Sequence, residues 1–90
     1  MYKIIFTPES EKNLAQLKKS EPLSFKKAVK LIDELVDHPT TGTGKPEPLS
    51  GDRAGQWSRR ISQKHRLIYM IDNEKVIVLL LSAYGHYGDK

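Results

Sequence analysis

The sequence contains no cysteine, and this absence excludes several kinds of site. Without thiols the chain can form no disulfide, offer no thiolate to zinc and use no thiol nucleophile. Long apolar runs are also missing. The apolar start is too short for a signal peptide, and no stretch approaches the ~20 residues of a membrane span. We therefore expect a soluble, cytoplasmic protein that does not associate with membranes.

Several familiar site signatures are missing as well. The histidines His38, His65 and His86 lie far apart and have no accompanying pairs of carboxylates, so we expect no metal site. Residues 42–45 (Gly-Thr-Gly-Lys) resemble part of a phosphate-binding loop, but Pro46 stands where the following helix should begin. Nucleotide hydrolysis is therefore excluded. A Gly-x-Ser-x-Gly elbow is also lacking, and no cofactor is expected.

The chain is short, and its length limits the architecture. Its 90 residues leave room for one core and one site, so we predict a single domain over residues 1–90. Multi-domain mechanisms and large cofactors do not fit a chain of this size.

Positive charge is concentrated in the centre of the chain. The net charge is +4, and residues 45–66 account for all of it, with six basic and two acidic residues. This block also holds every arginine of the protein, namely Arg53, Arg59, Arg60 and Arg66. The planar guanidinium group suits phosphate recognition, whereas lysine mainly keeps a helix surface soluble. The block therefore predicts a polyanionic partner.

The first half of the sequence predicts a strand followed by two helices. Apolar and polar residues alternate over residues 2–7, which is the period of a strand. Thr7-Pro8-Glu9 then provides an N-cap, a first-turn proline and an acid, and we expect a helix to about residue 19. Ser20-Glu21-Pro22 restarts the chain, and apolar residues spaced by three and four over residues 25–36 predict a second helix, which ends before Pro39.

The second half predicts a long loop and three strands. Residues 40–55 contain four glycines and two prolines, so this segment cannot hold a long regular element. The expected strands, joined by links short enough for hairpins, are residues 56–62, 66–71 and 75–84. The uninterrupted apolar run 76–81 is typical of a strand buried on both faces, which would make it the centre of the sheet.

These elements predict an α+β fold. We expect two N-terminal helices packed on one face of a four-stranded, mainly antiparallel sheet, with a groove on the other, partly open face. Two registers of the central hairpin are open. One places Arg66 on the face of Arg59, and the other places it on the face of Ser58 and Arg60.

The remaining candidates for chemistry are one carboxylate, the strand arginines and a histidine-tyrosine pair near the end of the chain. Taken separately, the carboxylate has a plain interpretation as a solvated loop acid, the arginines as an ordinary sheet edge and the histidine-tyrosine pair as a chain terminus. Together, a carboxylate, an arginine and a histidine are sufficient to cut RNA without a metal. A base deprotonates the 2'-hydroxyl, which attacks the adjacent phosphorus, while an acid protonates the departing 5' oxygen and a cation stabilises the charge. A tyrosine can stack on a base.

Four ordered blocks of the sequence resemble one known family. They are Gly44-Lys45-Pro46-Glu47-Pro48-Leu49, Trp57-Ser58-Arg59-Arg60-Ile61, His65-Arg66-Leu67-Ile68-Tyr69 and His86-Tyr87. This set resembles the Txe/YoeB family of RelE-like toxins, and the likeness spans nearly the whole chain. Membership implies the toxin of a bacterial toxin-antitoxin pair, an mRNA interferase that enters the ribosomal A site and cleaves the message there.

The resemblance also implies roles for individual residues. Glu47 corresponds to the general base, Arg66 to the cation that stabilises the phosphate, His86 to the general acid and Tyr87 to a group that positions the substrate. The motif positions implied to bind RNA are Lys45, Arg59 and Arg60. Trp57 is more typical of a packing residue than of a platform for a base.

The implied partners are the ribosome, its mRNA and a cognate antitoxin of the YefM/Axe kind, and the family also allows a homodimer. We expect the antitoxin to fold on binding and to cover the strand arginines with acidic side chains. Two other functions are compatible with the residues. One is a non-catalytic RNA- or DNA-binding module that uses the arginine cluster, and the other is a scaffold for a protein partner.

Overall fold

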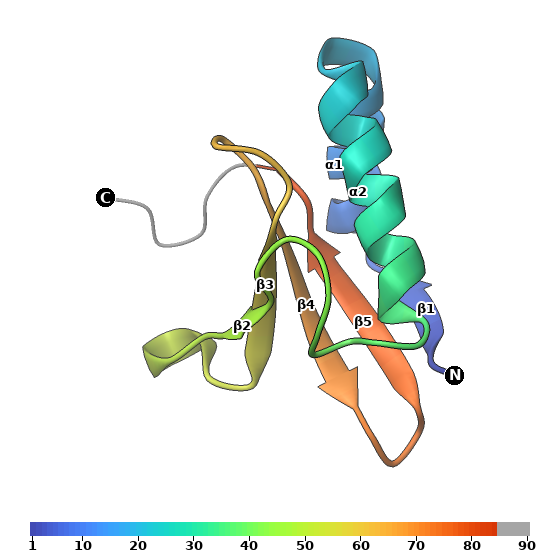
Figure 1. Cartoon of the computed structure of the whole chain (residues 1–90), viewed down its shortest axis with the longest axis vertical. Coiled ribbons are helices and arrows are strands. Elements are labelled where there is room, and N and C mark those ends of the chain that lie inside the picture. The colour runs from blue at the N-terminus through green and yellow to red at the C-terminus, as the bar shows by residue number, and fades with distance from the viewer. Residues whose placement is uncertain (85–90) are drawn as a thin grey trace.

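The computed structural model describes residues 1–84, in which two helices pack on one face of a five-stranded sheet (Figure 1). The elements in chain order are β1 (Lys3–Phe6), α1 (Pro8–Ser20), α2 (Pro22–Leu35), β2 (Glu47–Pro48), a single 3-10 turn (Gly51–Arg53), β3 (Gln56–Arg60), β4 (Arg66–Asp72) and β5 (Ile77–Ser82). The sheet has the order β1-β5-β4-β3-β2, in which β1 and β5 are parallel and the other neighbours are antiparallel. The predicted α+β architecture is confirmed.

The two helices begin where their sequences predict. The Thr7 side chain accepts a hydrogen bond from the Ser10 amide at 3.1 Å, and Pro8 occupies the first turn of α1. Pro22 opens α2, whose residues Leu31 and Leu35 are fully buried in the core beneath the sheet. No helix within residues 1–84 is long and apolar enough to cross a membrane.

The sheet differs from expectation in strand number and in its centre. The additional strand β2 has two residues and lies inside the loop predicted to be irregular. Pro46 and Pro48 fix their own φ angles, and Pro48 favours an extended Glu47 before it, so this short segment can pair with the edge of β3. The middle strand is β4, and the prediction that residues 76–81 form the centre was wrong. In β5, Val78 is fully buried, whereas Leu79 on the other face is only partly buried.

The register of the β3–β4 hairpin settles the face of Arg66. Arg60 pairs with Arg66, and Ser58 pairs with Ile68, so Arg66 shares a face with Ser58 and Arg60. Arg59 points to the opposite face, toward the helices, because successive side chains of a strand alternate. The pairing of Glu47 with Ser58 adds Glu47 to the face of Arg66.

Candidate active site

The structure brings two of the predicted catalytic residues to the same open face of the sheet. Glu47 is exposed on β2 and lies opposite Ser58 of β3. Arg66 starts β4, and its Nη1 donates a hydrogen bond to the Ser58 Oγ at 3.3 Å. The guanidinium therefore extends from β4 across β3, in the direction of the strand that carries Glu47. A carboxylate and a guanidinium that share one face of the sheet, on the two strands that flank β3, can act on one bound phosphodiester.

Ser58 is the residue of this site that the sequence analysis missed. Its side chain is fully buried between Glu47 and Arg66, and it orients the Arg66 guanidinium. The available signal was strand alternation, which places a small hydroxyl residue two positions before Arg60 on the same face.

Lys45 and Arg60 lie near the end of β3 that is next to Arg66. The Arg60 amide donates to the Gly44 carbonyl at 2.7 Å, which places Lys45 close to the end of β3. Both side chains are exposed, and Arg60 lies directly opposite Arg66. No carboxylate of residues 1–84 forms an ion pair with Arg60 or Arg66. We call Lys45, Arg60 and Arg66 the basic cluster; its positive charge favours an anionic ligand.

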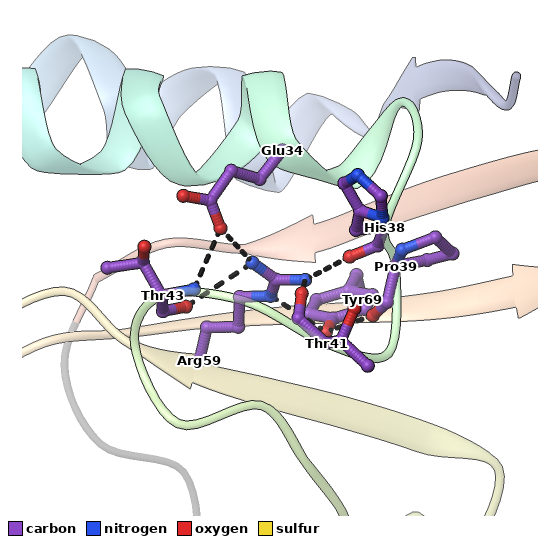
Figure 2. A network of polar contacts seen from close by, with 7 residues as sticks. All are labelled: Glu34, His38, Pro39, Thr41, Thr43, Arg59 and Tyr69. Atoms are coloured by element: carbon purple, nitrogen blue, oxygen red, sulfur yellow. Dashed lines mark hydrogen bonds and ion pairs between the residues drawn. The ribbon is translucent and has the colours of Figure 1, made fainter.

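Arg59 does not belong to the basic cluster, and its burial contradicts the prediction that it binds RNA directly. Its side chain is 0% exposed on the helix side of β3. Figure 2 shows its guanidinium enclosed by Glu34, Tyr69 and the loop that follows α2. Sequence alone could not decide which of two adjacent arginines faces inward, because the choice depends on register.

The remaining predicted site residues, His86 and Tyr87, lie outside the described residues. The last side chain described is Tyr84, whose ring lies 4.3 Å from the ring of His65, measured between centroids. His65 is buried, and its Nε2 is hydrogen-bonded to the Glu21 carboxylate at 2.8 Å. This hydrogen bond lowers the pKa of Glu21 below its ordinary value, against the opposing effect of burial. Tyr84, which follows β5, therefore packs against a buried histidine that is itself held by Glu21.

Trp57 lies on the helix side of β3, opposite Tyr69, and packs against the core. Its interpretation as a packing residue is confirmed.

Within residues 1–84, no three histidine, aspartate or glutamate side chains are grouped so that they could hold a metal ion. The side chains that the structure places on the open face provide acid-base and charge-stabilising groups.

Comparisons with known proteins identify the family of the chain. A family model described as the YoeB-like toxin of bacterial type II toxin-antitoxin systems matches residues 6–87. Toxin YoeB of Mycobacterium bovis is 34% identical over 87 residues, which are 97% of this chain and 100% of that protein.

Solved structures show the same fold. The YoeB/ParE toxin from Agrobacterium tumefaciens is similar with a TM-score of 0.88 and 33% identity, covering 94% of this chain and 99% of that one. A YoeB dimer from Staphylococcus aureus has a TM-score of 0.81 and 29% identity, over 96% of this chain and 98% of that one. A YoeB-YefM complex from the same organism also has a TM-score of 0.81, with 28% identity over 97% and 99%. This chain therefore belongs to the YoeB-like toxin family of bacterial type II toxin-antitoxin systems and has a RelE-like fold.

Proposed function

We propose that the chain is a ribosome-dependent endoribonuclease that cleaves mRNA in the A site, as the toxin of its toxin-antitoxin system. The observation that supports this most strongly is the shared open face of Glu47 and Arg66, joined through Ser58. Cleavage is a transesterification that needs no metal, and its products carry a 2',3'-cyclic phosphate and a 5'-hydroxyl.

In this reaction Glu47 removes the proton of the 2'-hydroxyl, whose oxygen then bonds to the adjacent phosphorus. Arg66 neutralises the charge that develops on the phosphate oxygens. His86 gives a proton to the departing 5' oxygen, and Tyr87 positions the nucleotide. General base and general acid each contribute roughly 10²- to 10⁴-fold, and a positioned cation adds a comparable factor. Lys45 and Arg60 bind flanking phosphates.

The ribosome holds the message in the orientation that the small open face cannot impose by itself. Three cationic side chains on an open surface cannot hold a flexible strand in attack geometry, and the loss of orientation costs several orders of magnitude in rate. Cleavage of free RNA is therefore weak, and cleavage of ribosome-bound message in the cytoplasm is fast.

We propose that the partner in the resting cell is a YefM-like antitoxin, since a relative of this fold was crystallised in a YoeB-YefM complex. Acidic side chains of the antitoxin would cover the basic cluster, and Arg59 would take no part because it is buried. A homodimer is also proposed, on the precedent of the Staphylococcus aureus YoeB dimer.

The test compares Glu47→Gln with a matched control, Glu74→Gln, which removes an exposed acid from the β4–β5 turn. The 5' ends of transcripts are mapped after expression of each variant, of the wild type and of His86→Ala. We expect wild-type cuts to persist in Glu74→Gln and to disappear in the other two variants. Cuts that persist in Glu47→Gln would overturn the assignment of the base.

The alternative is a non-catalytic RNA- or DNA-binding module, for which the basic cluster alone is sufficient. Ribosome binding and cleavage, measured together for the same variants, distinguish the two functions. An enzyme retains ribosome binding in Glu47→Gln and loses cleavage, whereas a module binds and never cleaves. Because the cluster binds through phosphates, affinity in either case falls steeply with salt.

A further inference from the structure

Arg59 is the most extensively bonded buried side chain in the described part of the protein, and the proposed reaction does not use it. Its Nη1 donates to the Glu34 Oε1 at 2.8 Å, and its Nε donates to the Tyr69 hydroxyl at 3.2 Å. The other partners are backbone carbonyls of the loop after α2, namely those of His38, Thr41 and Thr43. One buried cation therefore binds three separate points of a single loop.

The same loop is tied to Arg59 indirectly through both of its side-chain partners. The Tyr69 hydroxyl donates to the Pro39 carbonyl at 2.7 Å. The Thr43 amide donates to the Glu34 Oε1 at 2.9 Å, so one carboxylate oxygen bridges the loop and the guanidinium. Figure 2 shows these groups converging from α2, β4 and the loop.

Glycine is required where the loop passes this cluster. A Cβ on Gly42 would lie 2.5 Å from the Glu34 Oε1 and 3.3 Å from the Arg59 Nη1, at a φ of +114° that side chains rarely adopt. A Cβ on Gly44 would lie 3.0 Å from the Arg60 carbonyl oxygen. The loop is thus closely packed between α2 and β3.

This loop leads directly to Glu47, whose own strand is short. β2 has two residues, and Pro46 and Pro48 have no amide hydrogen to donate to β3. Lys45, between Gly44 and Pro46, is in the left-handed region with a φ of +52°. Such a conformation is unfavourable for a residue with a side chain, so its surroundings must enforce it.

We infer that Arg59 is a positioning residue for Glu47. From the helix side of β3 it fixes the loop through residue 43, and the adjacent residue Ser58 receives Glu47 on the open face. Arg59 and Ser58, on opposite faces of β3, thereby hold the two ends of the segment from Thr43 to Glu47. This inference rests on the proposed function, because Glu47 has to be the base for its placement to affect cleavage.

The test uses Arg59→Lys, which keeps the charge but cannot bind all of these acceptors with one ammonium group. Amide hydrogen exchange is measured at Thr43, Arg60 and Leu49, whose amides donate to Glu34, Gly44 and Gln56. We expect exchange at these amides to accelerate at least tenfold. The Lys3 amide, which donates to Val76 at the far edge, should be unaffected.

Single-turnover cleavage on programmed ribosomes provides the second measurement. We expect Arg59→Lys to reduce kcat by ~10²-fold with little change in KM, because the base is displaced while the basic cluster is intact. Gly42→Ala disturbs the same contacts from the loop and should have the same effect. Val78→Ala is the matched control, since it weakens the buried core of β5 without touching the loop and should keep kcat.

Three outcomes would contradict the inference. They are a wild-type kcat in folded Arg59→Lys, unchanged exchange at the loop amides, or an equal loss of kcat in Val78→Ala. Failure of the proposed function is recognised separately, because then the wild type does not cleave or Glu47→Gln cleaves as well as the wild type.

Discussion

Replacing Arg59 with methionine should be among the most destabilising single changes in this protein. The substitution keeps an unbranched apolar stem but removes the cation paired with the Glu34 carboxylate and the donor of three loop carbonyls. Removing one partner of a buried ion pair costs ~3 to 5 kcal/mol. The Glu34 side chain is 24% exposed and can recruit water, which reduces the expected cost to about 2 to 4 kcal/mol.

That cost is large for a domain of 90 residues, whose total stability is about 5 to 13 kcal/mol. A loss near 3 kcal/mol should lower Tm by roughly 12 to 24 °C. Urea unfolding followed by circular dichroism measures the difference, and an unchanged m-value shows that the two curves are comparable.

The matched control is Arg60→Met, because the adjacent arginine is exposed on the opposite face. Surface changes of this kind usually stay within about 0.5 kcal/mol. Equal losses in the two variants, or a loss below about 1 kcal/mol in Arg59→Met, would refute the reasoning that the buried guanidinium organises the loop.

Three further predictions follow from particular contacts. The pKa of Glu34 is lowered by hydrogen bonds from Thr43 and then by Arg59, so its contribution to stability is complete above its ordinary value of 4.5 and is lost as pH falls through the lower folded value. Urea unfolding at pH 7 and at pH 3 should therefore show a larger loss on acidification in the wild type than in Glu34→Gln, and equal losses would contradict this. Val76 has a φ of +55°, which is strained for a β-branched residue, so Val76→Asn should raise the unfolding free energy by about 1 kcal/mol. Val76→Ala should gain less, since the asparagine side chain can hydrogen-bond to the nearby backbone in the left-handed region and a methyl group cannot; an equal gain would exclude this preference as the cause. Ser58→Ala removes the acceptor that orients Arg66 and should slow cleavage by up to about tenfold with no change in the bound-ribosome fraction; unchanged cleavage would show that this hydrogen bond does not matter.

Much of the fold could be predicted because local signals were strong. The Thr7-Pro8 start of α1 and the apolar stripe of α2 were readable in the sequence, and both helices begin where predicted. β2 was missed because two residues, one of them a proline, have no periodicity to detect. The position of β5 was misjudged because an apolar run reports burial, whereas the order of strands depends on β1 pairing with β5.

The site could be predicted only as a set of residue types. The sequence indicated Glu47 and the arginines but could not decide which of Arg59 and Arg60 shares the face of Arg66, because a shift of one residue in register exchanges them. Register depends on the pairing of Arg60 with Arg66 and of Glu47 with Ser58, which no local pattern specifies. The contact between Arg59 and Glu34 joins residues 25 positions apart and leaves no local pattern.

The most direct test of the central claim removes the nucleophile rather than a side chain. Ribosomes are programmed with a message that carries a single 2'-deoxy nucleotide at the mapped cut position, and the matched all-ribose message serves as the control. If the face of Glu47 and Arg66 promotes attack by the 2'-hydroxyl, the wild-type protein cleaves only the all-ribose message and leaves a 2',3'-cyclic phosphate. Cleavage at the deoxy position, or a product that ends in a 3'-hydroxyl, would contradict the account.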